Sequence, residues 1–174
     1  VSTSDDGTIR TWNANTGEML EIFDFEGVET DTIVVSSDGA IFAGNDDGEI
    51  SLLQGGELQQ TYQAHEAGIK RLVYSEASKR LVSLSYDRTV KIWQLDDAQN
   101  LNLQLDSKLP PVIWPRSCAF VGEDQLAFAT FGSNYALLDL NTSEWDLSKI
   151  DPTGGKNAVY KLNDDIYTIG DAGI

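Results

Sequence analysis

Residues 81–93 read Leu-Val-Ser-Leu-Ser-Tyr-Asp-Arg-Thr-Val-Lys-Ile-Trp, and this stretch decides the fold. Val90 and Ile92 alternate with Lys91, which is the period-2 pattern of a strand with one buried face. We therefore predict two short strands joined by a tight turn at Asp87-Arg88. A close copy, Ser-Thr-Ser-Asp-Asp-Gly-Thr-Ile-Arg-Thr-Trp, occupies residues 2–12. Both copies contain Asp, any residue, Thr, a β-branched aliphatic residue, a basic residue, any residue and then Trp, which indicates an internal repeat.

The spacing of the turns gives the period of this repeat. The turn residues Asp6, Asp47, Asp87 and Ser133 lie 41, 40 and 46 residues apart. Short alternating segments between Gly, Asn and Asp turns supply four strands in each complete unit. A period of about 40–45 residues with four strands a unit is typical of propeller blades. We therefore predict an all-β fold, a β-propeller of four-stranded antiparallel blades, with about four blades present and an incomplete ring.

The units follow one another without a linker, so we treat the chain as one propeller domain or a portion of one. The approximate unit boundaries are 1–30, 31–63, 64–108, 109–150 and a partial unit at 151–174. The first residue, Val1, falls inside an expected strand. We therefore expect the chain to be a fragment or a processed product of a longer protein.

The charge balance restricts the class of partner. Twelve Lys and Arg residues against 28 Asp and Glu residues give a net charge of −16. Such a surface repels phosphate backbones and anionic lipids, so we expect neither nucleic acid nor membrane as a partner, and we favour a protein with a basic surface. Cys118 is the single cysteine, which excludes an internal disulfide framework and suits a reducing compartment. With no signal peptide at the start of the sequence, we expect a cytoplasmic location.

The repeated pattern resembles the WD-repeat family of β-propellers. It is carried by residues 6–12, Asp-Gly-Thr-Ile-Arg-Thr-Trp, and by residues 87–93, Asp-Arg-Thr-Val-Lys-Ile-Trp. A third carrier is His65, preceded by Ala where the family usually has Gly at the start of a repeat. The pattern is weaker in the second and fourth units, where Leu53 and Asp139 stand at the Trp position.

The resemblance also bears on ring closure, because the family usually has seven or eight blades. Open propeller ends would leave unpaired apolar sheet surface. We therefore expect the chain to dock on missing blades, on another chain or on copies of itself. A four-bladed ring closed by the strand that opens the fifth unit is the alternative, but it would leave a second strand over.

His65, Ser83, Asp87 and Trp93 are the chemically richest set in the sequence. Ser, His and Asp could form a hydrolase triad. The resemblance implies instead one structural hydrogen-bond chain, from the indole N–H through the hydroxyl and the imidazole to the carboxylate. We favour the structural role because the hydroxyl is then committed to the indole and no oxyanion motif accompanies it. Ser85 is the alternative hydroxyl, and because His65 is the only histidine we expect the third blade to be the most stable.

Two other patterns suggest ligand sites and have simpler explanations. Paired acidic residues lie at 5–6, 46–47, 96–97 and 164–165. None extends into the alternating ligand spacing of a calcium loop, and Asp-Gly pairs are common in hairpin turns. Gly154-Gly155-Lys156 lacks the first glycine and the following Ser or Thr of a phosphate loop, so we predict an exposed loop there. We predict no metal and no cofactor.

Trp114 and Arg116 are the best candidates for binding a partner. Three prolines predict that residues 106–115 form a rigid loop inside the array, and this loop leads into the fourth unit. Trp and Arg side chains are enriched in the residues that dominate interface energies. The alternative is that Trp114 packs over the core of its own blade, because Trp is usually well buried.

Tyr86 joins these candidates because it precedes the turn residue Asp87. By the resemblance, this position often lies on the face that carries the loops entering the blades. Asp5 and Asp46 match Tyr86 in the first and second units and would make the face acidic. We therefore predict that Tyr86 and Asp46 contact the partner together with Trp114.

These observations favour a non-enzymatic protein–protein interaction scaffold that presents an acidic propeller face to a protein or peptide. The first alternative is a propeller with a small-ligand or catalytic site in its central channel, since fold alone excludes no activity. Such a site needs acids, histidines or metal ligands from several blades, and the sequence contains a single histidine, which argues against this alternative. The second alternative is a purely structural segment of a larger multidomain protein.

Overall fold

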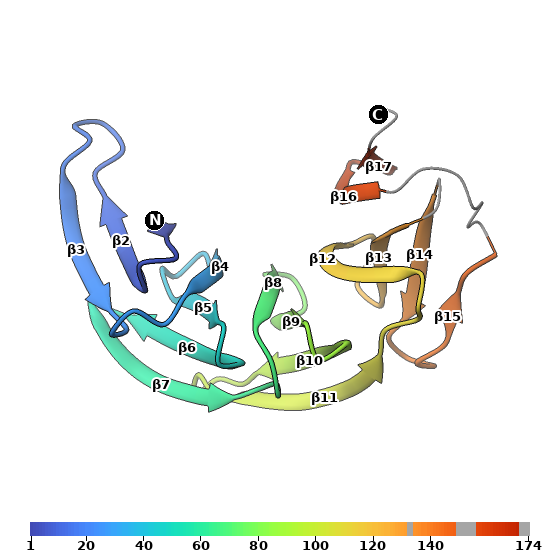
Figure 1. Cartoon of the computed structure of the whole chain (residues 1–174), viewed down its shortest axis with the longest axis horizontal. Coiled ribbons are helices and arrows are strands. Elements are labelled where there is room, and N and C mark those ends of the chain that lie inside the picture. The colour runs from blue at the N-terminus through green and yellow to red at the C-terminus, as the bar shows by residue number, and fades with distance from the viewer. Residues whose placement is uncertain (132–133, 149–155, 171–174) are drawn as a thin grey trace.

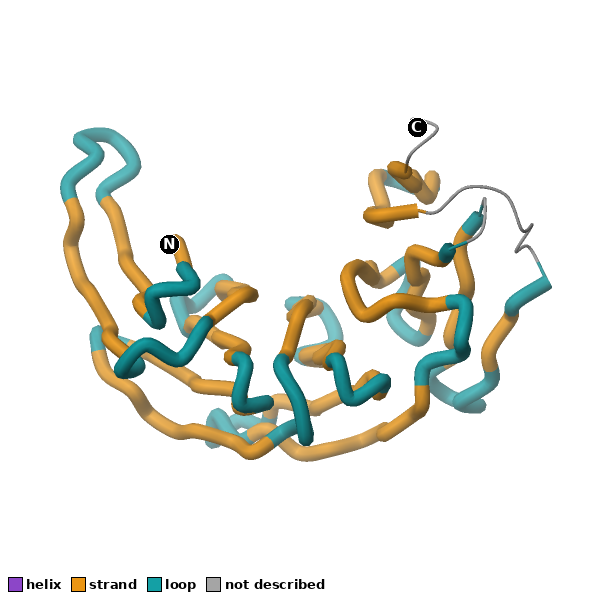
Figure 2. Tube along the Cα trace, viewed as in Figure 1, coloured by secondary structure: helices purple, strands orange, loops and turns teal. Residues whose placement is uncertain are grey.

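The computed structural model describes residues 1–131, 134–148 and 156–170, and these residues form strands and loops with no helix (Figure 2). Blade 1 consists of β1 (Ser2–Thr3), β2 (Thr8–Trp12) and β3 (Met19–Asp24). Blade 2 consists of β4 (Thr30–Val35), β5 (Ile41–Asn45), β6 (Glu49–Gln54) and β7 (Glu57–Gln63). Blade 3 consists of β8 (Ile69–Ser75), β9 (Arg80–Ser85), β10 (Thr89–Leu95) and β11 (Leu101–Lys108). Blade 4 consists of β12 (Ile113–Phe120), β13 (Gln125–Thr130), β14 (Tyr135–Asp139) and β15 (Trp145–Asp146). Blade 5 consists of β16 (Lys156–Leu162) and β17 (Asp165–Gly170).

Each blade is an antiparallel meander in which consecutive strands are hydrogen-bonded neighbours. The blades stand side by side along an arc (Figure 1). The strands β4, β8 and β12 lie on the inner side of the arc, and β3, β7 and β11 lie on its outer side. The predicted all-β fold of four-stranded antiparallel blades, with about four blades and an open ring, is therefore confirmed. Among the described residues, blades 2, 3 and 4 have four strands, blade 1 has three and blade 5 has two. No helix in the described part of the chain is long and apolar enough to cross a membrane.

The core lies between the blades, because each inner blade is buried on both faces. In β9, Leu81 belongs to the cluster shared with blade 2, whereas Val82 and Leu84 belong to the cluster shared with blade 4. A strand buried on both faces reads as an apolar run rather than as a strict alternation. The outer strand β7 has no fully buried residue, which explains its polar sequence.

The two end blades each leave one apolar face uncovered. In blade 1, Ile9 packs against blade 2, while Trp12 and Ile22 are exposed. In blade 5, Val159 packs against blade 4, while Tyr160 and Leu162 are exposed. Unpaired apolar sheet surface at the open ends was expected from the sequence, and it is present.

One local prediction was wrong. Residues 106–115 were expected to form a loop, but β11 extends to Lys108 and β12 begins at Ile113. Pro115 is tolerated within β12 because the register of β12 with β13 shifts between Ile113 and Cys118, so the missing N–H breaks no regular ladder. Trp114 and Arg116 are therefore strand residues. Ser133 and residues 154–155 lie outside the described residues, and nothing is described of the side chain of residue 156.

In blades 1, 2 and 3, the turn between the second and third strands docks onto the segment that follows the outer strand. The carbonyl oxygen of Gly48 accepts hydrogen bonds from the N–H groups of Ala64 and His65, at 3.0 and 2.9 Å. Gly7 and Arg88 occupy the same position in blades 1 and 3, and their carbonyl oxygens accept in the same way from Phe25 and Leu109. Gly48 has a φ of 79°, and a Cβ there would lie 2.3 Å from the carbonyl oxygen of His65.

The close approach at Gly48 predicts a large effect of adding one methyl group. Gly39→Ala is the matched control, because Gly39 has a φ of 87° and no atom within 4 Å of its added Cβ. We expect Gly39→Ala to cost about 1–2 kcal/mol from the left-handed backbone alone. We expect Gly48→Ala to cost at least about 2 kcal/mol more, because the turn must also move away from His65. Urea denaturation of both variants measures the difference, and equal losses would contradict the docking described above.

Candidate functional site

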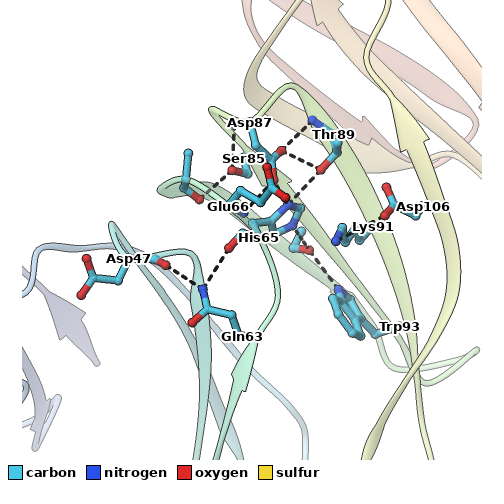
Figure 3. Close-up of polar contacts among 12 residues, drawn as sticks. Asp47, Gln63, His65, Glu66, Ser85, Asp87, Thr89, Lys91, Trp93 and Asp106 are labelled. Atoms are coloured by element: carbon cyan, nitrogen blue, oxygen red, sulfur yellow. Dashed lines mark hydrogen bonds and ion pairs between the residues drawn. The ribbon is translucent and has the colours of Figure 1, made fainter.

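Four side chains of blade 3 form one continuous hydrogen-bonded chain, part of which is visible in Figure 3. The indole Nε1–H of Trp93 donates to Ser83 Oγ at 2.9 Å. Ser83 Oγ lies 2.7 Å from His65 Nε2. His65 Nδ1 lies 2.9 Å from Asp87 Oδ2. The sequence resemblance implied this order of contacts, and it places the segment entering blade 3 against the β9–β10 turn.

The partners of His65 determine its tautomer. Asp87 is an acceptor, so Nδ1 carries the proton and donates it. Nε2 then accepts from the Ser83 hydroxyl, whose oxygen in turn accepts from the Trp93 indole. Thr89 Oγ1 donates to Asp87 Oδ1 at 2.6 Å, and the backbone N–H of Glu66 donates to Asp87 Oδ2 at 3.1 Å. Every member is therefore paired, which is the condition under which a buried polar network stabilises a fold.

Burial and charge act in opposite directions on this network. Burial lowers the pKa of His65 below its ordinary value, and this effect outweighs the attraction of the Asp87 carboxylate. Burial alone would raise the pKa of Asp87, but hydrogen bonds from Thr89 and Glu66 and the neighbouring imidazole keep that pKa below its usual value. The pair is therefore a neutral imidazole beside a carboxylate and not a salt bridge at neutral pH.

The Ser83–His65–Asp87 order is also that of a hydrolase triad, but this set cannot act as one. Ser83 is completely buried and His65 is buried, so no substrate reaches the hydroxyl. Its oxygen already accepts a hydrogen bond from Trp93. Ser85, the alternative hydroxyl, donates to the carbonyl oxygen of Ala67 at 2.7 Å and is not part of the chain.

Blade 1 contains two hydrogen bonds of the same kind, which were not predicted from the sequence. The indole of Trp12 donates to Ser2 Oγ at 2.9 Å, and Thr8 Oγ1 donates to Asp6 Oδ1 at 2.6 Å. The signal was available, because Ser2 and Trp12 are ten residues apart, as are Ser83 and Trp93. Blade 1 has no imidazole to join the two halves.

The second candidate site is an exposed row of aromatic rings on one edge of blades 3 and 4. The ring centroids of Tyr86 and Trp114 are 5.8 Å apart, and those of Trp114 and Phe131 are 6.0 Å apart. The three residues are 43%, 38% and 56% exposed. Trp114 therefore does not pack over the core of its own blade. We call Tyr86, Trp114 and Phe131 the aromatic row.

Phe131 was not among the predicted contact residues. Its backbone N–H donates to the carbonyl oxygen of Val112, as the N–H of Tyr86 donates to Gly68 and that of Asp46 donates to Glu29. These contacts make Phe131 the blade 4 counterpart of Tyr86 and Asp46. The spacing of 46 residues to Ser133 concealed this, because aligning Ser133 with Asp87 placed Gly132 at that position.

Lys70 joins the aromatic row to its acidic neighbours. It lies on β8, forms ion pairs with Asp31 and Asp46, and its Nζ is 4.7 Å from the centroid of the Tyr86 ring. Burial alone would lower the pKa of Lys70, but hydrogen bonds to the two carboxylates raise it well above its ordinary value. The ammonium group therefore remains charged and acts as a fixed bridge.

Arg116 completes this surface. Asp31, Lys70, Tyr86 and Arg116 line an open hollow of about 370 Å³. Next to the hollow, carboxylate oxygens of Asp5, Glu29 and Asp31 lie within 4.8 Å of one another, and all three residues are exposed. These carboxylates are the one group in the described residues that could hold a metal ion, but exposed acids cluster without one. The structure thus brings together three of the predicted residues, Tyr86, Trp114 and Arg116, and links them to Asp46 through Lys70.

The hydrogen-bond chain predicts the cost of removing its central hydroxyl. Ser83→Ala leaves the Trp93 indole and His65 Nε2 unpaired in a buried site, and we expect a loss of about 2–4 kcal/mol in unfolding free energy. The matched control is Ser51→Ala, a buried serine whose hydroxyl has a single contact, 3.5 Å from that of Thr61. We expect it to cost less than about 1 kcal/mol. Denaturant unfolding compares the two, and a Ser83→Ala loss no larger than the control would contradict the role of the chain.

The lowered pKa of His65 predicts a pH dependence. Below about pH 6.5 the unfolded chain binds a proton at His65 while the folded chain does not, so unfolding is favoured as pH falls. We expect the unfolding free energy to decrease from pH 7 to pH 5, and we expect His65→Gln to remove part of that slope. Denaturation at several pH values measures both slopes. Identical slopes, or a wild type that gains stability at pH 5, would show that the imidazole is not held neutral.

Comparison with known proteins supports the fold and the repeat. The family model described as "WD domain, G-beta repeat" matches residues 56–94, which include His65, Ser83, Asp87 and Trp93. The β-propeller domain of Cps50 (Swd1) from Myceliophteria thermophila superposes with a TM-score of 0.73 at 10% identity, covering 98% of this chain and 76% of that one. The computationally designed Ika8 protein also gives 0.73, at 19% identity, covering 98% of this chain and 52% of that one.

Curated relatives are similar over about half of this chain or somewhat more. The target of rapamycin complex subunit wat1 of Schizosaccharomyces pombe is 34% identical over 107 residues, which are 56% of this chain and 34% of the relative. The pre-mRNA-splicing factor PRP46 of Candida glabrata is 30% identical over 100 residues, covering 51% of this chain and 23% of the relative. The U3 small nucleolar RNA-associated protein 12 of Saccharomyces cerevisiae is 28% identical, covering 65% of this chain and 12% of the relative. The matched regions therefore cover between 12% and 34% of each relative's length. The repeat match and the blade topology together show that the chain has a β-propeller fold and contains a WD40 repeat at residues 56–94.

Proposed function

We propose that this chain is a non-enzymatic interaction scaffold that binds a protein or peptide through the face carrying the aromatic row. The observation that carries the proposal is the exposure of three large rings in a row, in which Trp114 contacts both Tyr86 and Phe131. Exposed contiguous aromatic surface on a folded domain marks interaction sites, and aromatic residues dominate interface energies. Arg116 lies beside this surface in the same hollow as Tyr86.

The charge of the chain favours a partner with a basic surface. The net charge is −16, and the aromatic row adjoins the carboxylates of Asp31 and Asp46 through Lys70. Complementary charge steers encounter and suppresses partners of like charge. One relative is named as the subunit of a complex, which agrees with a binding function. The uncovered faces of blades 1 and 5 supply a second surface, which further blades or another chain would cover.

A catalytic or small-ligand site in the channel is the other candidate function, and the geometry gives it little support. The hollow between blades 2, 3 and 4 contains one lysine, one arginine, one carboxylate and one phenol. Lys70 is held protonated by its two carboxylate partners, so it cannot act as a general base near neutral pH. The only histidine is buried in the structural network.

Three substitutions on this face should weaken binding strongly without unfolding the protein. Tyr86→Ala/Trp114→Ala/Arg116→Ala should weaken the affinity for a partner at least tenfold, because exposed aromatic and Arg residues contribute most of the binding energy. The matched control is Leu58→Ala/Leu103→Ala, which removes exposed apolar side chains from the outer strands β7 and β11. Affinity capture on each immobilised variant identifies the partner, and titration calorimetry gives its affinity.

The control shows whether the loss of exposed apolar area elsewhere on the propeller is enough to weaken binding. A partner that is retained by Leu58→Ala/Leu103→Ala and lost from the triple variant supports the proposal. A partner that binds the triple variant as tightly as the wild type would place the interaction elsewhere on the propeller.

A further inference from the structure

The exposed face changes character from one blade to the next at equivalent backbone positions. Asp46, Tyr86 and Phe131 each follow the second strand of their blade and make the same backbone hydrogen bond. In the inner strands, Thr30, Ile69 and Ile113 each pair with a residue of the second strand of their blade. The residues that directly follow them are Asp31, Lys70 and Trp114. Blade 2 therefore presents two carboxylates, blade 3 an ammonium over a phenol ring, and blade 4 two aromatic rings. In the repeat, Asp5 of blade 1 corresponds to Asp46.

Two cations contact the faces of rings in the aromatic half of this surface. Lys70 Nζ lies over the Tyr86 ring, and the Arg88 guanidinium lies 6.0 Å from the centroid of the Trp114 ring. Arg88 Nη2 also donates to the carbonyl oxygen of Pro110 at 2.9 Å. Contacts of this kind fix the rings before a partner arrives, which lowers the entropic cost of binding.

Arg88 also carries backbone strain that blades 1 and 2 avoid. It has a φ of 68°, whereas glycine occupies the equivalent positions, Gly7 and Gly48, at a φ of 79°. A side chain in this conformation costs about 1–2 kcal/mol. An arginine at the one strained position beside Trp114 indicates that its side chain has a function there.

The acidic half has more negative charge than its neighbours neutralise. Lys70 is the cation that contacts this region, and it pairs with Asp31 and Asp46. Within the described ranges, Asp5 and Glu29 form no ion pair. The crowding is strong enough that the carboxylates of Asp46 and Asp5 raise the pKa of Glu29. A cation supplied by a partner would relieve this repulsion.

We propose that this face binds one extended segment that combines an apolar side chain, seated on the aromatic row, with a Lys or Arg placed against Asp5 and Glu29. This inference rests on the proposed interaction function and specifies the chemistry of the partner. The cations also set the direction of the segment. Arg88 and Arg116 repel a basic group from blade 4, so the basic end of the segment lies towards blade 1 and the apolar end towards blade 4.

Selection from a displayed library of random twelve-residue peptides tests this chemistry directly. The whole chain is immobilised, and the enriched peptides are then titrated against variants by fluorescence anisotropy. We expect the enriched sequences to combine an aromatic or large aliphatic residue with Lys or Arg on one side. Asp5→Asn/Glu29→Gln should weaken their binding roughly three- to tenfold and flatten its salt dependence. Glu57→Gln/Asp97→Asn changes the net charge equally at exposed sites off this face and should leave binding unchanged.

A third variant separates the contribution of Arg88 to peptide binding from its contribution to the stability of the fold. Arg88→Gly removes the strain and matches blades 1 and 2, so it should not lower the unfolding midpoint. It should nevertheless weaken peptide binding several-fold, because Trp114 loses its cationic neighbour. The inference would be overturned if Arg88→Gly and Asp5→Asn/Glu29→Gln both bound the enriched peptides as tightly as the wild type does.

The outcomes separate this inference from the function on which it rests. Peptides that depend on Tyr86 and Trp114 but carry Asp or Glu instead of Lys or Arg would overturn the inference and leave the interaction function standing. Peptides that bind Tyr86→Ala/Trp114→Ala/Arg116→Ala as well as the wild type would overturn both. Failure to enrich any sequence above background would also overturn both.

Discussion

The imidazole of His65 joins the segment that enters blade 3 to the β9–β10 hairpin, and the geometry of blade 3 depends on this link. Through Nδ1 it holds the turn residue Asp87, and through Nε2 it holds Ser83 in the middle of β9. The backbone of the same residue donates to the Gly48 carbonyl oxygen of blade 2. One residue therefore fixes the position of a turn, the register of a strand and the distance to the preceding blade. The cost of burying four polar groups is offset because each one is paired.

That constraint has a functional consequence one residue away. Because the β9–β10 turn is fixed, Tyr86 leaves β9 in a defined direction, and its ring meets Trp114 of the next blade. His65, Ser83 and Asp87, whose side chains could suggest catalysis, are thus structural. The neighbouring residue Tyr86 contributes to the exposed surface instead. A repeat fold separates these roles well, because the backbone positions recur while the side chains at one edge are free to differ.

Much of the fold could be predicted because its signals are local. The Asp-Gly turns and the alternation around Lys91 fix strands within a few residues, and the spacing of about 40 residues fixes the blades. The hydrogen-bond chain was accessible only through the family resemblance, because its members are spread over residues 65–93. The segment around Trp114 could not be predicted correctly from its prolines. Proline usually interrupts a strand, but the register shift between Ile113 and Cys118 accommodates Pro115 within β12. Phe131 was missed because the alignment of turns placed Ser133 opposite Asp87, one residue too far along the fourth unit.

The protonation state of His65 tests the central claim most directly, since the account requires a neutral imidazole that donates from Nδ1. His65 is the only histidine, so its ring signals in a nitrogen–proton correlation NMR spectrum need no further assignment. At pH 6.5, where an ordinary histidine is half protonated, we expect the neutral Nδ1–H form to predominate, with its proton protected from exchange. A doubly protonated ring, or a neutral ring with the proton on Nε2, would contradict the hydrogen-bond chain from Trp93 to Asp87.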